Sequence, residues 1–112
     1  MDLTPYLIGS FQFENLVRNR IPFTLLNLGA SLDDLFPSFH QGHLTSVSVT
    51  VSPEQALPRV RELRLPAEGA IVLVCNDGEA SISLIPRLLD MGYTNVFAVR
   101  GGSQTLQEEL KN

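Results

Sequence analysis

The sequence predicts an α/β domain, with a central, mainly parallel sheet of four to five strands flanked by helices on both faces. Four short apolar runs have the character of strands, and helical patterns separate them. Strands that alternate with helices imply βαβ units, whose right-handed crossovers cover both faces of the sheet. The 112 residues are 44% hydrophobic and 18% charged, which excludes a disordered chain and supports a single domain over residues 1–112.

The predicted strands differ in how apolar they are. The runs 24–28, 70–74 and 96–99 are nearly continuous in apolar residues, as expected of parallel strands buried on both faces. The run 47–51 alternates apolar and polar residues, which predicts a strand with one more polar face.

Four helices are expected, over residues 13–19, 52–65, 81–91 and 103–110. The second begins with a Ser cap followed by Pro53 at the first helical position, a favourable start. Pro58 should weaken the second turn of that helix, and Pro86 should bend the third helix or delay its start. Gly92 supplies the left-handed residue that ends the third helix.

Charge and hydropathy limit the partners and the location. Eight basic and twelve acidic residues give a net charge of −4, and the basic residues form no continuous stripe, so nucleic acid is not expected as a partner. No apolar stretch approaches the ~18 residues that cross a bilayer. The first ten residues lack the basic region and long apolar run of a signal peptide. The expected location is therefore the cytoplasm, without membrane binding.

Cys75 is the only cysteine, so neither an internal disulfide nor a zinc site of several thiolates is possible. It ends the apolar run 70–74 and opens a loop that runs into a helix, Asn76-Asp77-Gly78-Glu79-Ala80-Ser81. Such a loop, at the carboxyl end of a parallel strand, turns N–H groups and a helix amino terminus toward one point. A thiol at that point is stabilised as the nucleophilic thiolate, whereas the alternative is a small buried side chain at a strand end.

The segment 70–102 resembles the second half of a rhodanese domain. Cys75 follows an apolar strand, Gly78 and Ser81 follow the cysteine, Gly92-Tyr93 closes the helix, and the strand VFAV precedes Gly101-Gly102. The first half is similar more loosely. There LLNLGA takes the place of the family's strand-end Asp-x-Arg, and residues 39–44 resemble its aromatic-x-x-Gly-His-Ile segment.

The resemblance implies sulfur transfer without a cofactor or a metal. Cys75 would take sulfane sulfur from a donor such as thiosulfate or a protein persulfide, and would pass it to a thiophilic acceptor. The N–H groups of residues 76–81 would cradle the persulfide, and the Ser81 hydroxyl would hydrogen-bond the sulfur. Asn27 and Arg100, at neighbouring strand ends, would line the substrate site, although an exposed ion-pair role is the favoured interpretation of Arg100.

Several positions depart from the family's pattern. Ala80 stands where the family often has Arg, and Asn27 stands in place of its strand-end Asp. Asp77 and Glu79 add carboxylates, which oppose a dianion such as thiosulfate, so weak turnover of thiosulfate is expected. The alternatives are a catalytically quiet module for protein interaction or regulation, and a relay that accepts sulfur only from a protein persulfide.

Two other chemistries are disfavoured. A phosphatase of the related cell-cycle type needs an Arg that closes the cysteine loop, and neither Ala80 nor Ser81 can replace it. His40 and His43 suggest a metal site, but two histidines without a second thiol are too few for a closed one. His43 is instead expected to pack and hydrogen-bond at a turn.

Overall fold

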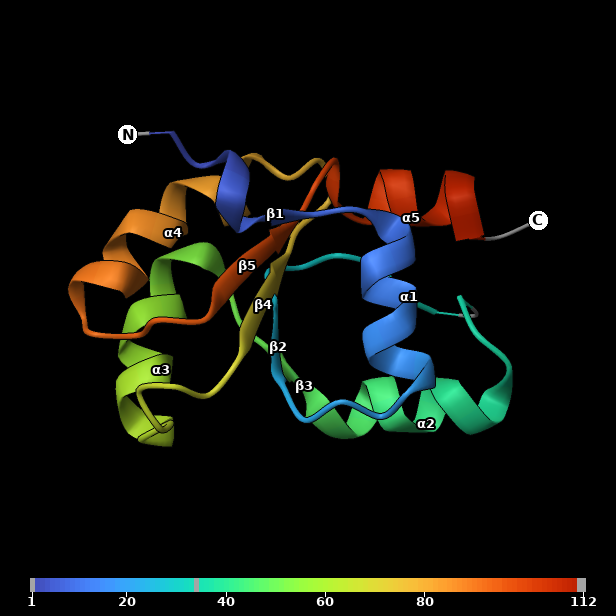
Figure 1. Cartoon of the computed structure of the whole chain (residues 1–112), viewed down its shortest axis with the longest axis horizontal. Coiled ribbons are helices and arrows are strands. Elements are labelled where there is room, and N and C mark those ends of the chain that lie inside the picture. The colour runs from blue at the N-terminus through green and yellow to red at the C-terminus, as the bar shows by residue number, and fades with distance from the viewer. Residues whose placement is uncertain (1, 34, 111–112) are drawn as a thin grey trace.

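A parallel five-stranded sheet runs through the centre of the computed structural model, which describes residues 2–33 and 35–110 (Figure 1). The strand order is β1-β5-β4-β2-β3, and every neighbouring pair is parallel. The strands are β1 Leu7–Ile8, β2 Thr24–Asn27, β3 Ser48–Thr50, β4 Ile71–Val74 and β5 Val96–Val99. The helices are α1 Ser10–Arg18, α2 Ser38–Val47, α3 Ala56–Leu63, α4 Glu79–Asp90 and α5 Gly102–Leu110, with short 3-10 helices η1 Thr4–Tyr6 and η2 Pro53–Gln55.

Two hydrophobic clusters lie on opposite faces of the sheet. In the central strand β4 all four residues are buried, and successive side chains point to opposite faces. Val72 and Val74 pack with residues of α1, α2 and α5, whereas Ile71 and Leu73 pack with residues of α3 and α4. Figure 1 shows these two groups of helices on either side of the strands. The predicted α/β architecture, with helices on both faces, is confirmed.

Two elements were not expected from the sequence. Strand β1 has two residues and pairs with Ala98 and Val99 of β5, a long-range contact that no local pattern announces. Helix α2 contains Gly42 and two histidines, which are weak helix formers. It is held in place by the buried Leu44 and by Gln41, whose side chain bonds to backbone groups of the preceding loop.

The two helical prolines fall at positions that the fold tolerates. Residues 53–55 form a 3-10 turn, so α3 begins at Ala56 and Pro58 lies in its first turn, where a missing N–H breaks no intrahelical bond. The expected weakening of a second turn is therefore wrong. Helix α4 begins at Glu79, before the expected Ser81, so Pro86 lies inside the helix and did not delay its start. No helix of the described residues is long and apolar enough to span a membrane.

Candidate functional site

The Cys75 sulfur lies directly beyond β4, on the face of the sheet that α3 and α4 cover. The residue is 4% exposed, and its neighbours in the cluster are apolar. The Gly78 N–H donates a hydrogen bond to Cys75 Sγ at 3.1 Å. The Cys75 thiol in turn donates a long hydrogen bond, at 3.9 Å, to Oδ1 of the exposed Asp77. The sulfur thus lies between a backbone amide and a carboxylate, at the start of α4.

Gly78 turns the chain so that its amide faces the sulfur. Its φ of +91° is in the left-handed region, and a Cβ there would lie 3.2 Å from the Gly101 nitrogen. In the first turn of α4, the Glu79 N–H is bound by Asp77 Oδ1 at 3.0 Å. The amides of Ala80 and Ser81 donate to no acceptor among residues 2–33 and 35–110. The amino end of α4 therefore keeps two free donors in the loop that carries the thiol.

The loop carbonyls point the other way, toward α5. The Ser103 N–H donates to the Cys75 carbonyl at 2.8 Å, and the Gln104 N–H donates to the Asn76 carbonyl at 3.1 Å. A trans peptide directs its N–H opposite to its carbonyl, so the Asn76 and Asp77 amides point away from α5. Gly102 permits this approach, since a Cβ there would overlap the Cys75 carbonyl oxygen and lie 2.7 Å from both the carbonyl carbon and oxygen of Asn76.

Ser81 contributes a buried hydroxyl to the same helix end. The residue is 0% exposed, and its Oγ has no hydrogen-bond partner among the described residues. Ser81 is the third residue of α4, and Cα–Cβ bonds in a helix tilt toward its amino terminus, which here is the cysteine loop. An unpaired buried hydroxyl costs free energy, so a hydrogen-bond acceptor would be favoured at this point.

The charges that border the sulfur are negative. Of the loop residues, Asn76, Asp77 and Glu79 are exposed, and residues 75–81 contain no cation. Arg100 is also exposed but lines a cavity of about 370 Å³ on the β1 side, with Gly9, Ser10, Phe11, Thr105 and Glu109. Neither Cys75 nor any residue of 76–81 lines that cavity. The Arg100 residue thus lines a cavity that the cysteine loop does not line, although the Gly101 nitrogen that follows it lies close to Gly78.

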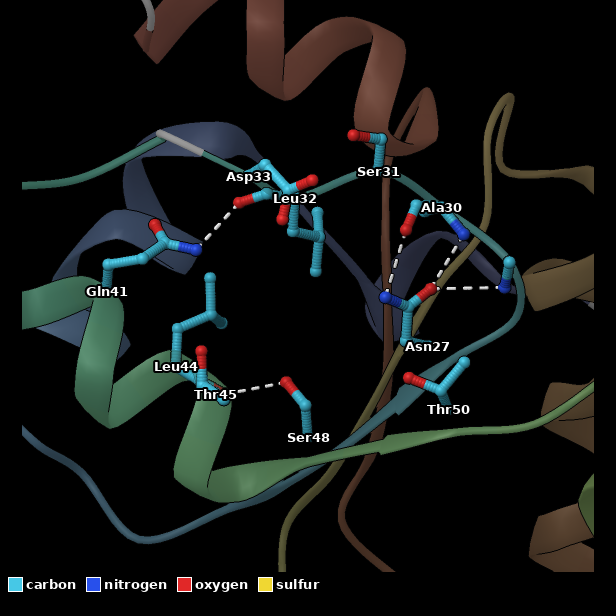
Figure 2. A pocket seen from close by; sticks show the side chains of 11 residues that line it. Asn27, Ala30, Ser31, Leu32, Asp33, Gln41, Leu44, Thr45, Ser48 and Thr50 are labelled. Carbon is cyan, nitrogen blue, oxygen red and sulfur yellow. Dashed lines mark hydrogen bonds between the residues drawn. The ribbon is translucent and has the colours of Figure 1, made fainter. Parts of the chain in front are cut away.

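Asn27 ends β2, and Figure 2 shows its side chain bonded to the loop that follows this strand. It pairs in register with Val74, so its side chain lies on the opposite face of the sheet from that of Cys75. Its Oδ1 accepts hydrogen bonds from the Gly29 N–H at 3.1 Å and the Ala30 N–H at 2.7 Å, and its Nδ2 donates to the Ala30 carbonyl at 3.0 Å. These three bonds brace the loop after β2, which lines a polar cavity of about 340 Å³ together with α2. Cys75 does not line this cavity either.

The histidine pair lies in helix α2 rather than at a turn. The His43 ring meets the Phe23 ring edge to face with centroids 6.4 Å apart, and its Nε2 has no hydrogen-bond partner among the described residues. The expectation of a hydrogen-bonded His43 at a turn is therefore wrong. In the part of the chain that the structure describes, no three residues of His, Cys, Asp and Glu come together as a metal site would need.

The sequence predicts the cysteine loop but not the residues of α5 that bind its carbonyl groups. Ser103 and Gln104 each lie 28 positions after the loop residue whose carbonyl their amide binds, Cys75 and Asn76 respectively. The signal that could have found them is the pair Gly101-Gly102 before a Ser cap, because two adjacent glycines at a helix start indicate close backbone approach.

No protein-family model and no curated protein matches this sequence. Solved structures do match in fold. The rhodanese-like domain of an Anabaena protein has a TM-score of 0.68 at 13% identity, over 96% of this chain and 75% of that one. The human single-domain sulfurtransferase TSTD1 has a TM-score of 0.66 at 10% identity, over 93% of this chain and 96% of that one. A thiosulfate sulfurtransferase from Pseudomonas aeruginosa has a TM-score of 0.66 at 14% identity, over 91% of this chain and 18% of that one. The chain therefore has the rhodanese-like fold.

Proposed function

We propose that this protein is a sulfurtransferase or persulfide carrier that holds sulfane sulfur on Cys75. The thiolate attacks the outer sulfur of a donor, the bond between that sulfur and the donor breaks, and the donor leaves with the electron pair. With thiosulfate the products are the Cys75 persulfide anion and sulfite. A thiophilic acceptor then attacks the outer sulfur and regenerates the thiolate, so each cycle is balanced without a cofactor.

The observation that carries the proposal is the position of the sulfur. A buried Sγ accepts the Gly78 N–H at 3.1 Å at the amino end of α4, the end of a helix that stabilises anions. A persulfide places its outer sulfur ~2 Å beyond Sγ. The free amides of Ala80 and Ser81 and the unpaired Ser81 hydroxyl are the donors available to that second sulfur. The similarity of the fold to sulfurtransferases adds support.

A second candidate is an interaction module in which Cys75 has no chemical role. The 4% exposure of the cysteine and the two carboxylates at Asp77 and Glu79 favour it, because both hinder an anionic donor. In this case the exposed loop would bind a protein partner. Either role is compatible with the reducing cytoplasm, where a lone cysteine stays a thiol.

Intact-mass spectrometry separates the two functions. The purified protein is incubated with thiosulfate and, separately, with the persulfide of cysteamine, and its mass is measured before and after cyanide. A sulfur carrier gains the mass of one sulfur atom from at least one donor and loses it to cyanide, and Cys75→Ala gains nothing. If wild-type protein acquires no cyanide-labile sulfur from either donor, the sulfur-carrying function is rejected and the interaction module remains.

A further inference from the structure

We infer that the cysteine loop selects its sulfur donor by charge, and that the donor is an organic persulfide with a neutral or cationic substituent rather than thiosulfate. This inference rests on the proposed function, since it concerns the donor for the same thiol. It assigns to Asp77 the role of a specificity-determining residue, which is distinct from the nucleophile.

The position of Asp77 beside the sulfur is the first observation. Its Oδ1 lies 3.9 Å from Cys75 Sγ, and the Glu79 N–H holds the same oxygen at 3.0 Å, so the carboxylate is oriented rather than free to swing away. The residue is exposed while Cys75 is 4% exposed. Asp77 therefore presents a charge to solvent next to the buried sulfur, where a donor that reacts with the sulfur comes close to this carboxylate.

The distribution of the other charges is the second observation. Glu79 is exposed two residues further on, and residues 75–81 carry no cation that would offset the two carboxylates. Arg100, the nearest strand-end cation in the sequence pattern, lines a different cavity together with Glu109. The donors that favour an anion here are the Gly78 N–H, which the sulfur accepts, and the unpaired groups at the amino end of α4, the Ser81 hydroxyl among them. These donors thus favour one negative charge on the sulfur, whereas the two carboxylates repel an additional negative charge on the incoming donor.

The transfer of sulfur from an organic persulfide to Cys75 balances in atoms, protons and electrons. The Cys75 thiolate attacks the outer sulfur of R–S–SH, the S–S bond of the donor breaks, and RS⁻ leaves with the electron pair. The proton of the donor ends on RS⁻, so the products are the Cys75 persulfide anion and the thiol RSH. No oxidant or reductant enters the step. A cationic R group would lie on the solvent side of the loop, next to Asp77 and Glu79.

A matched pair of donors tests the selection. The persulfides of cysteamine and of 3-mercaptopropionate have the same two-carbon spacer and carry opposite charges. The ratio of their rates cancels the reactivity of the Cys75 thiol, and the change of that ratio between variants also cancels the different leaving tendencies of the two donor thiols. One unit charge ~6 Å from another in water-like surroundings changes a rate about threefold, so reversing the donor charge changes it roughly tenfold. We expect wild-type Cys75 to gain sulfur about ten times faster from the cationic donor at low ionic strength.

Asp77→Asn should reduce this ratio several-fold, because Asn keeps an oxygen that can accept the Glu79 N–H and removes only the charge. Glu79→Gln provides a second variant, should the first fail to fold. Asp90→Asn is the matched control, since it removes an exposed carboxylate at the far end of α4 and should leave the ratio within twofold of wild type. In about 1 M salt, with a Debye length of ~3 Å, the wild-type ratio should shrink.

The possible outcomes distinguish failure of the sulfur-carrying function from failure of charge selection. If no donor loads Cys75, the proposed function itself fails. If both donors load it, but at equal rates or faster from the anionic one, charge selection is refuted and the sulfur-carrying function stands. Charge selection is equally refuted if Asp77→Asn and Glu79→Gln leave the ratio unchanged, or if Asp90→Asn lowers it as much as they do.

Discussion

Replacing Gly102 by alanine should damage the cysteine loop from a distance of 27 residues in sequence. The new Cβ would overlap the Cys75 carbonyl oxygen and lie 2.7 Å from the carbonyl carbon and oxygen of Asn76, all of which are backbone atoms that cannot rotate away. Either the loop or the start of α5 must move. The movement breaks the hydrogen bonds from the Ser103 and Gln104 amides to the loop carbonyls.

The expected loss of stability follows from these contacts. Two backbone hydrogen bonds contribute about 1 kcal/mol each, and an alanine held at the observed φ of +66° costs about 1 kcal/mol more. The free energy of unfolding should fall by about 3 kcal/mol, which corresponds to a decrease in Tm of roughly 10–20 °C for a domain of this size. Urea denaturation measures the first quantity and thermal denaturation the second.

Gly42→Ala is the matched control for this substitution. Gly42 lies inside α2, and a Cβ there meets nothing within 4 Å. Its replacement should be neutral or should stabilise the protein by about 0.5–1 kcal/mol, because alanine is the better helix former. A second readout is local, since the displaced loop of Gly102→Ala should allow faster alkylation of the buried Cys75. The reasoning is refuted if Gly102→Ala costs no more than about 1 kcal/mol and leaves alkylation unchanged.

Three further substitutions test separate parts of the structure. Pro86→Ala restores a backbone N–H inside α4 and should raise the free energy of unfolding by about 1 kcal/mol in urea; a loss of stability would contradict the assigned helix. Asn27→Ala removes three hydrogen bonds and should lower the free energy of unfolding by about 2 kcal/mol. The rate of sulfur uptake, followed by intact mass, should stay within about twofold of wild type, because this side chain and that of Cys75 lie on opposite faces of the sheet. Ser81→Ala removes a buried hydroxyl without a partner, so the stability of the resting protein should be unchanged or higher. The Cys75 persulfide of that variant should nevertheless decay several-fold faster, and an unchanged lifetime would remove Ser81 from the site.

The sequence predicts the parts of the fold that rest on local patterns. Strands β2, β4 and β5 are buried between two layers of helices. Strands that are covered on both faces are apolar along their whole length, so a short apolar run in the sequence predicts them. Strand β1 has no apolar run of this kind, because it consists of only two residues that pair with β5. Helix α2 depends on contacts of Leu44 and Gln41 with the rest of the molecule, which override the poor helix propensity of its own residues.

The candidate site divides in the same way. The position of Cys75 at a strand end and of Gly78 at the turn follows from local spacing, and the structure has both where the spacing predicts them. The location of Asn27 depends on the register between β2 and β4, because a shift of one residue would exchange its face with that of its neighbours. Local sequence carries no information on that register, so Asn27 could be assigned to the right edge of the sheet but not to one of its faces.

The bonds between the cysteine loop and α5 also set an order of events during synthesis. The thiol-bearing turn leaves the ribosome before Ser103 and Gln104, whose amides fasten its carbonyls. Until those residues emerge, the carbonyl groups of Cys75 and Asn76 lack these two hydrogen-bond donors. The sulfur-carrying role proposed for Cys75 would thus require that α5 has docked, because the Ser103 and Gln104 amides then bind the loop carbonyls.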